Sequence, residues 1–520
     1  MKKLKDMTLK EKLGQLLFVG FSGHEYNDHI RTLVEDYKVG NIILFARNIK
    51  NIKQLSELNR TLHEEIIKNT GLMPLIAIDQ EGGIVTRIMS GATFCPGNMT
   101  LAATNPENSY KVGEIMGKEL SRLGINMNLA PSLDVNNNPK NPVIGVRSYS
   151  DDPELVSQLG VNFIKGLQSQ GIIATAKHFP GHGDVEVDSH LGLPIVEHDK
   201  ERLNTVELYP FKKAIASGVD AIMSAHIVFK AYEEENIPAT ISRKVMTDLL
   251  REELGFEGLI VSDCMEMKAI DDHYTTAKGV ALGIHAGLDM VFVSHTLEKQ
   301  IGALKEIENL INLGKISMEE IDQKVERILK YKEKTYKTIK EYFFDNKENL
   351  KYFEEPENKE FAQKVVDDSL TIVKGEKLKL EGKTLLLATI PYATTIVEDE
   401  LDTRNIIDAV KREVPEIDTL EMPMKDIDLS LLEKLDQYDQ VVVCSYNASN
   451  FEKQAEMINM IIKRAKKTFI LSTRNPYDLL FIRNAENYAC LYEYTPNSVR
   501  TIVKYLKGEI EPKGKLPIKL

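Results

Sequence analysis

The feature that most constrains the fold is a regular alternation of short apolar runs with longer helical patterns over the first two thirds of the chain. Each run is aliphatic or β-branched and too short for an amphipathic surface helix, which is typical of buried parallel strands. The segments between them, such as 51–69 and 108–124, repeat apolar residues at spacings of three and four, which predicts helices. The runs cover residues 16–21, 41–45, 75–79, 125–131, 172–179, 221–227, 258–263 and 289–294.

Eight strands with helical crossovers predict a (β/α)₈ barrel, which needs about 250 residues. An open, doubly wound sheet is the alternative. The position of the chemically rich residues favours the barrel, because barrel active sites gather at the carboxyl ends of the strands. Asp79, Lys177, His178, His226 and Asp263 all stand at such ends.

The composition changes near residue 330, where a strongly charged segment with few aliphatic residues begins. This change predicts the end of a helix followed by a linker. A second αβ series follows, with apolar runs at 384–390, 440–446, 467–473 and 488–494 and helical patterns near 397–413, 452–466 and 497–508. We therefore predict a barrel over 1–340, a linker over 341–365, and a smaller α/β sandwich domain with a largely parallel sheet over 366–520. This domain lacks a glycine-rich nucleotide-binding turn after its first strand.

Bulk properties argue against several classes of function. The formal net charge of −12 does not favour a nucleic-acid partner. No apolar segment approaches the ~20 residues of a membrane span, and no signal-peptide pattern follows the N-terminus, so a cytoplasmic location is expected. The four cysteines are far apart, which suggests neither a zinc cage nor a disulfide framework.

The most unusual segment is KHFPGHGDVEVDSH, residues 177–190. Its histidines and acids are possible metal ligands, but Pro180, Gly181 and Gly183 break any helix that would pair them. A solvated surface loop is the plainest interpretation. A catalytic loop is favoured over both, because the segment leaves a strand end, where functional residues concentrate.

Within this segment, Asp188 and His190 are two residues apart, so both side chains can face the same way. A carboxylate beside an imidazole fixes its tautomer and stabilises the imidazolium, which makes an acid/base unit. Asp263 closes a buried run and is either a helix N-cap or a nucleophile aimed into the barrel mouth. A carboxylate nucleophile with a separate acid/base is the arrangement of a retaining glycosidase.

Further polar residues stand at the same strand ends. Arg87 is close enough in sequence to pair with Asp79, either as a structural salt bridge or to help bind sugar hydroxyls. Arg147 lies in a loop after the fourth strand and is either solvated or a donor at the rim. Lys177 and His178 could donate to a sugar or acyl oxygen.

Four of these motifs, taken in order, resemble glycoside hydrolase family 3. They are IDQEGG with an arginine four residues later (78–87), IGVRSY (144–149), KHFPGHGD with DSH (177–190), and GLIVSD (258–263). The DSH segment looks like the β-N-acetylglucosaminidase branch, and the C-terminal part is similar to the α/β sandwich domain of many members. Cys264 and Met265 follow GLIVSD where many relatives have an acidic or aromatic residue, and the chain has no Trp to stack on a sugar.

The resemblance implies roles position by position. Asp263 matches the nucleophile, His190 the acid/base, and Asp188 the carboxylate that orients it. The positions that match N-acetylglucosamine-binding residues are Asp79, Arg87, Arg147, Lys177 and His178.

The implied reaction is retaining hydrolysis of terminal β-linked N-acetylglucosamine, from muropeptides in cell-wall recycling or from chitooligosaccharides, without metal or cofactor. The partner is thus a small carbohydrate, with no nucleic acid or membrane. Phosphorolysis is the alternative, because a histidine acid/base is neutral after it donates its proton and repels phosphate less than a carboxylate would. A β-glucosidase-type hydrolase, a metalloenzyme and a sugar-binding module are weaker alternatives.

Overall fold

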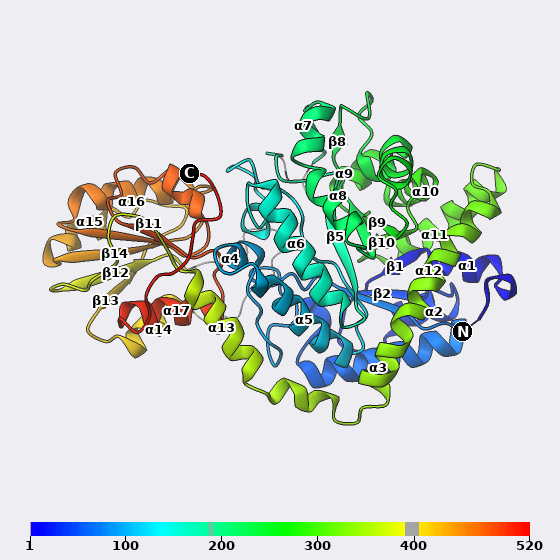
Figure 1. Cartoon of the computed structure of the whole chain (residues 1–520), viewed down its shortest axis with the longest axis horizontal. Coiled ribbons are helices and arrows are strands. Elements are labelled where there is room, and N and C mark those ends of the chain that lie inside the picture. The colour runs from blue at the N-terminus through cyan, green and yellow to red at the C-terminus, as the bar shows by residue number, and fades with distance from the viewer. Residues whose placement is uncertain (1, 187, 189, 191, 391–404) are drawn as a thin grey trace.

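The computed structural model describes residues 2–186, 188, 190, 192–390 and 405–520. It contains a barrel domain and a second α/β domain, which lie side by side (Figure 1). The chain passes from one to the other along a helical segment on the lower side of Figure 1, where α13 (Glu357–Ser369) leads into the second domain.

The first domain is a closed barrel of eight parallel strands, as the sequence predicts. The strand order around the barrel is β1-β10-β9-β7-β5-β4-β3-β2. Closure is direct, because β1 pairs with both β10 and β2, which excludes an open sheet. The strands are β1 (Leu17–Val19), β2 (Asn41–Leu44), β3 (Leu75–Ile78), β4 (Met127–Asn128), β5 (Ile173–Phe179), β7 (Ala221–Ser224), β9 (Leu259–Cys264) and β10 (Met290–Val293).

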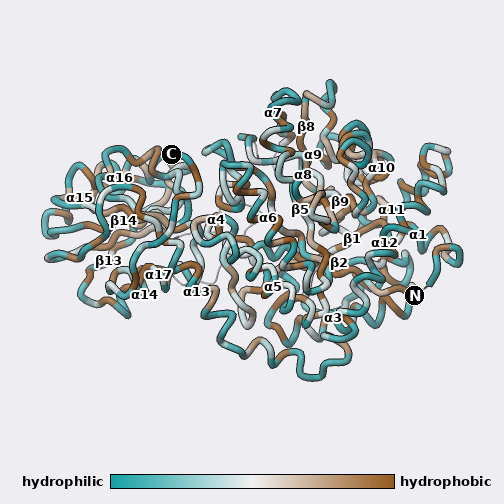
Figure 2. The backbone as a smooth tube through the Cα atoms, viewed as in Figure 1, coloured by the Kyte–Doolittle hydropathy of each residue, from teal (hydrophilic) through white to brown (hydrophobic). Residues whose placement is uncertain are grey.

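The barrel strands have continuous apolar sequences because both of their faces are buried, one inside the barrel and the other under the helices. Inward side chains fill the barrel, as where Phe18 stacks on Phe292 with ring centroids 4.4 Å apart, and outward side chains meet the helices. Figure 2 shows hydrophobic residues along β1, β2, β5 and β9, and hydrophilic residues on outer segments such as α7 (Lys200–Thr205).

The covering helices are amphipathic, and their ends carry capping residues. In α3 (Ile52–Thr70), the Asn51 side chain accepts a hydrogen bond from the Gln54 backbone N–H, and Gly71 ends the helix in the left-handed conformation. The other α-helices of this domain are α1 (Leu9–Gln15), α2 (Asp28–Glu35), α4 (Asn98–Ala102), α5 (Glu107–Arg122), α6 (Pro153–Gln168), α7, α8 (Tyr209–Ala216), α9 (Lys268–Tyr274), α10 (Thr276–Ala286), α11 (Leu297–Asn312) and α12 (Met318–Ile339).

Short elements complete the first domain and the segment that connects it to the second domain. β6 (Ile195–Val196) and β8 (Val228–Phe229) form a small parallel pair near the barrel mouth. The short 3₁₀ and π-helical turns are η1 (Leu4–Asp6), η2 (Ala46–Asn48), η3 (Gly145–Arg147), η4 (Ala239–Ile241), η5 (Lys244–Glu253), η6 (Lys340–Phe344) and η7 (Asn349–Glu354). The segment predicted to be a linker, 341–365, thus contains most of η6, η7 and the first part of α13.

The second domain is built on a six-stranded sheet with the order β11-β16-β15-β14-β12-β13. The sheet is parallel except for β11, which pairs antiparallel with β16, so the predicted largely parallel sheet is confirmed. Its strands are β11 (Thr371–Lys374), β12 (Thr384–Ala388), β13 (Asp418–Glu421), β14 (Gln440–Ser445), β15 (Thr468–Ser472) and β16 (Tyr488–Cys490). Its helices are α14 (Ile406–Glu413), α15 (Leu429–Lys434), η8 (Leu435–Gln437), α16 (Glu452–Arg464), η9 (Pro476–Leu480) and α17 (Pro496–Leu506).

Two edge strands of this sheet, β11 and β13, are absent from the predicted series. Both lie at sheet edges, where exposed and polar positions replace a continuous apolar run. The first part of the helix predicted near 397–413 falls on residues outside the described ones, and its described part is α14.

The four cysteines are free thiols, and Cys95, Cys444 and Cys490 are buried. Within the described parts of the chain, no helix is both long enough and apolar enough to cross a bilayer.

Candidate active site

The barrel mouth contains a cavity of about 420 Å³ at the carboxyl ends of the strands. Of the residues predicted to form a site, the structure brings together at this cavity Asp79, Arg87, Arg147, Lys177, His178, His190 and Asp263. Asp188 is joined to the cavity through its hydrogen bond to His190. The strand ends therefore converge in space as the sequence pattern predicts.

Asp263 stands at the end of β9 and is partly exposed to the cavity. One of its carboxylate oxygens accepts a hydrogen bond from the Cys264 backbone N–H at 2.7 Å. Burial alone would raise the pKa of Asp263, but the positive charge available on His178, His226 and His190 lowers it to about 2. Asp263 is therefore an anion at neutral pH, as a nucleophile must be.

His190 and Asp188 form the predicted pair. Nδ1 of His190 lies 2.7 Å from Oδ1 of Asp188, and the His190 backbone N–H donates to the same oxygen at 2.8 Å. Burial would raise the pKa of Asp188, but these hydrogen bonds lower it. Because the carboxylate accepts from Nδ1, Nε2 of His190 is left as the nitrogen for proton transfer.

A buried ion-pair network lies on another wall of the cavity. Nζ of Lys177 lies 2.8 Å from Asp79 and 2.6 Å from Glu81. Glu81 also accepts two hydrogen bonds from the guanidinium of Arg147, at 3.0 and 2.8 Å. Nη2 of Arg87 lies 3.7 Å from Asp79. Burial would raise the pKa of Glu81, but Arg147 and Lys177 lower it far more, so the network stays charged.

The turn that carries Asp79 and Glu81 needs glycine at two positions. Gly82 and Gly83 have φ values of 92° and 56°, in the left-handed region that glycine adopts at little cost. A Cβ at Gly83 would lie 2.8 Å from the Cα of Gly97, so the close approach of these two segments also excludes a side chain. The predicted sharp turn after β3 is thus present.

Asp134 fixes the start of the 177–190 loop. This fully buried carboxylate lies 2.7 Å from Nδ1 of His178 and accepts from the His182 backbone N–H at 2.7 Å. Burial would raise the pKa of Asp134, but His178 lowers it well below the usual range. Burial and the neighbouring His178 lower the pKa of His182 to about 4. His178 is thereby oriented with Nδ1 turned away from the cavity.

Sequence reasoning did not assign Glu81 or Asp134 to the site. Glu81 lies within the IDQEGG motif, and Asp134 follows the fourth apolar run by three residues, so position at a strand end was the available signal. The cavity lining also includes apolar and aromatic side chains, among them Phe45, Leu129, Val143, Met223, Met267 and Phe292.

The geometry narrows the predicted alternatives for several of these residues. Among the residues that the structure describes, the histidines and acids of 178–190 do not gather three ligand atoms at one point. Arg147 is not a solvated surface arginine, because its side chain is 3% exposed and is bound to Glu81. Asp263 is not seen capping α9, whose N-cap residue is Met267.

Fold and site together define the class of protein: a two-domain glycoside hydrolase built on a (β/α)₈ barrel. The model of the glycosyl hydrolase family 3 N-terminal domain matches residues 8–331. The chain therefore belongs to glycosyl hydrolase family 3, and its two-domain form groups with the β-hexosaminidases and β-N-acetylglucosaminidases of that family.

Individual relatives support this placement. Beta-hexosaminidase A of Pseudoalteromonas piscicida is 38% identical over 325 residues, which cover 58% of this chain but only 54% of that protein. A beta-hexosaminidase of Photobacterium profundum is 37% identical over 291 residues, covering 55% of this chain and 84% of the relative. The solved family 3 β-N-acetylglucosaminidase from Paenibacillus sp. str. FPU-7 has a TM-score of 0.91 at 38% identity and covers 99% of both chains.

Proposed function

We propose that the protein is a retaining exo-β-N-acetylglucosaminidase that releases terminal β-linked N-acetylglucosamine. The observation that carries the proposal is that an ionised aspartate, Asp263, and a carboxylate-backed imidazole, His190, line one cavity. A carboxylate nucleophile and a separate acid/base are what two-step hydrolysis with retention requires.

The proposed mechanism has two steps. Asp263 attacks the anomeric carbon while Nε2 of His190 gives its proton to the departing glycosidic oxygen. This step forms a carbon–oxygen bond to the enzyme and breaks the glycosidic bond. His190 then takes a proton from water, the resulting hydroxide equivalent attacks the same carbon, and the Asp263 carboxylate leaves. His190 is an imidazolium before the first step and again after the second, and Asp188 stabilises this charged form.

The sugar is held by the polar wall of the cavity. Asp79 and Arg87 line the cavity and offer an acceptor and donors for hydroxyl groups, while His178 offers a ring nitrogen. Lys177 and Arg147 are tied to Glu81 and Asp79, so they donate to the sugar from fixed positions. Fixed donors cost little reorganisation on binding, which favours tight positioning of the anomeric carbon.

The substrates proposed are muropeptide fragments carrying a terminal N-acetylglucosamine, and chitooligosaccharides. The names of the relatives, β-hexosaminidase and β-N-acetylglucosaminidase, support N-acetylglucosamine as the sugar. The role in cell-wall recycling and the cytoplasmic location remain predictions from the sequence.

The reaction is tested with nitrophenyl β-N-acetylglucosaminide and the matching β-glucoside, followed by proton NMR of the first sugar released. We expect strong preference for the N-acetylglucosaminide and initial release of the β-anomer. Initial release of the α-anomer would exclude a covalent intermediate, and preference for the glucoside would exclude the proposed sugar.

Phosphorolysis is the second candidate, and the histidine acid/base is the feature that favours it. After it protonates the leaving group, neutral His190 repels an incoming phosphate less than a carboxylate would. The assay is product analysis at physiological phosphate concentration. Free N-acetylglucosamine supports hydrolysis, whereas the 1-phosphate supports phosphorolysis.

A further inference from the structure

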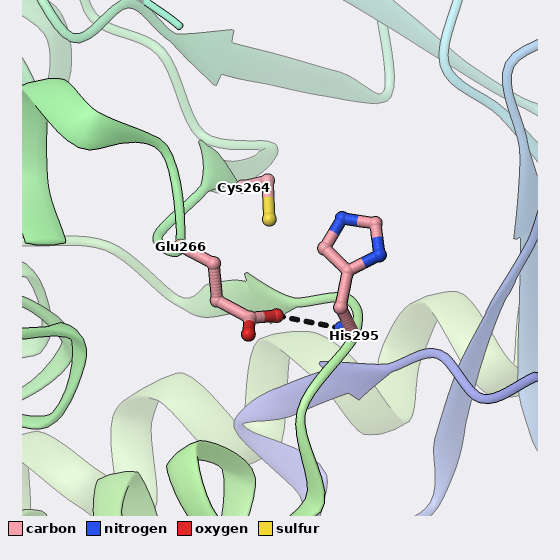
Figure 3. Close-up of side chains that lie close together, drawn as sticks. All are labelled: Cys264, Glu266 and His295. Carbon is pink, nitrogen blue, oxygen red and sulfur yellow. Dashed lines mark hydrogen bonds between the residues drawn. The ribbon is translucent and has the colours of Figure 1, made fainter.

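A second cluster of reactive side chains stands at the barrel mouth beside the proposed nucleophile. Cys264 ends β9, Glu266 follows in the next turn, and His295 follows the neighbouring strand β10 (Figure 3). One potential ligand atom from each residue lies within 4.8 Å of those from the other two. None of these residues has a part in the mechanism proposed above.

The local structure holds the three residues together. β9 and β10 are paired, with Cys264 in register with Phe292, and the Met265 backbone N–H donates to the Phe292 carbonyl at 2.8 Å. The His295 backbone N–H donates to one carboxylate oxygen of Glu266 (Figure 3), and the two atoms are 2.6 Å apart. The cluster is therefore part of the strand-end framework, although His295 itself is exposed.

The three residue types select the kind of ion. A thiolate, an imidazole and a carboxylate together suit Zn²⁺, whereas Ca²⁺ and Mg²⁺ require oxygen ligands. Around a tetrahedral zinc, with bonds of about 2.0–2.3 Å, ligand atoms lie roughly 3.3–3.8 Å apart. Small side-chain rotations would bring the three atoms from within 4.8 Å to that spacing. Three protein ligands leave the fourth position open to the cavity.

The charges of Arg47 and Lys299 act on His295 and oppose metal binding, but both cations are engaged with other groups. Lys299 pairs with Asp271 at 2.6 Å, and Arg47 donates to the carbonyls of Phe21 and Ser294 at 3.1 and 2.8 Å. A thiolate and a carboxylate bring two negative charges to a divalent ion, so the zinc complex itself is neutral.

We propose that Cys264, Glu266 and His295 form a zinc site whose occupation inhibits the enzyme competitively. All three residues line the same cavity as Asp263. An ion there takes up part of the cavity that the sugar would enter, so zinc and substrate exclude one another. The sequence predicts no resident metal, and this site takes up zinc when the ion is present rather than supplying chemistry to the reaction.

Metal binding stands independently of the proposed function, whereas inhibition rests on it, so the two are measured separately. Binding is measured by calorimetric titration of the whole protein with Zn²⁺ and by absorption with Co²⁺. We expect one equivalent to bind and a thiolate-to-cobalt charge-transfer band. Cys264→Ser should abolish that band, and His295→Gln, which changes an exposed residue, should weaken zinc binding roughly tenfold or more. His273→Gln, an exposed histidine on α9, is the matched control and should bind as the wild type.

Inhibition is measured as the ratio of activities with and without Zn²⁺ within each variant. The recovery of activity after a chelator is added is measured as well. We expect competitive inhibition that His295→Gln weakens and His273→Gln leaves unchanged. Equal weakening by His273→Gln, or binding without a thiolate band, would overturn the site. Full activity with one zinc bound would overturn the inhibitory role. The protein could also bind zinc through the cluster and yet show no glycosidase activity. That result would refute the proposed function but not the zinc site.

Discussion

At the residue scale, the charge state of Asp263 is set by the histidines around it. Its pKa is lowered to about 2, with burial opposing the effect of His178, His226 and His190. Because the pKa of Asp263 is lower in the folded than in the unfolded protein, its ionisation stabilises the fold. This stabilisation is complete above the unfolded pKa of about 4, and it is lost as pH falls through about 2. Protonation of Asp263, the proposed nucleophile, should therefore not cause any loss of activity above about pH 4.

His190 provides a test of the acid/base assignment. Because protonation matters most when the leaving group is poor, His190→Ala should slow hydrolysis of chitobiose by about 10²–10⁴-fold. Dinitrophenyl N-acetylglucosaminide, which needs no proton, should be cleaved in the first step at close to the wild-type rate. The measurement is pre-steady-state release of the dinitrophenolate.

The control for that experiment is His198→Ala. His198 also pairs with an aspartate, Asp184, at 2.6 Å, but it is not among the cavity-lining residues. It should lose little activity with either substrate. An equal loss for both substrates in His190→Ala would contradict the acid/base role.

At the element scale, strand ends could be predicted from sequence more reliably than the side chains that support them. Continuous apolar runs mark the strands, and three polar residues at or near the ends of the runs, Asp79, Lys177 and Asp263, meet at one cavity. Glu81 and Asp134 act by pairing with Arg147, Lys177 and His178, which are distant in sequence. Such partners follow from closure of the barrel, which no local pattern encodes. The edge strands β11 and β13 were missed because edge positions do not need to be apolar.

Helix α5 carries a buried acid whose effect on stability depends on pH. Glu119 is 5% exposed and accepts hydrogen bonds from the Thr93 backbone N–H at 3.0 and 3.2 Å. Burial raises the pKa of Glu119 to about 7. Because the pKa of Glu119 is higher in the folded than in the unfolded protein, its protonated form stabilises the fold. This stabilisation is complete below the unfolded pKa of about 4.3, and it is lost as pH rises through about 7.

Glu119→Gln should therefore gain stability relative to wild type as pH rises from 5 to 8, by at most about 3 kcal/mol. The measurement is urea denaturation at both pH values. Glu114→Gln on the same helix is the control, because Glu114 pairs with Lys111 and Lys118, which lower its pKa. A difference between wild type and Glu119→Gln that is constant with pH would show that Glu119 does not titrate in this range.

At the scale of the whole molecule, the second domain supports the turn that carries part of the site. Buried Glu493, just after β16, accepts hydrogen bonds from the Gly97 backbone N–H at 2.8 Å and from the Thr100 hydroxyl at 2.7 Å. Gly97 packs against Gly83, next to the Asp79–Glu81 segment. The hydroxyl of Tyr477 also donates to the carbonyl of Asn136 across the interface, at 3.0 Å.

Glu493→Ala should therefore lower kcat/KM by between about tenfold and a hundredfold, because the turn proposed to bind the sugar loses its support from the second domain. Glu511→Ala is the control, since Glu511 is an exposed acid of the same domain that pairs with Lys377. Steady-state kinetics are compared at temperatures well below each melting midpoint. Unchanged kcat/KM in folded Glu493→Ala would mean that the second domain does not position the site.

In the proposed mechanism, Asp263 becomes covalently bonded to the sugar. The most direct test is incubation with a fluorinated N-acetylglucosaminyl fluoride that forms the intermediate quickly and releases it slowly, followed by peptide mapping. We expect one glycosyl group per chain, attached to Asp263, and no adduct in Asp263→Asn. A label on another residue, or full turnover by Asp263→Asn, would contradict it.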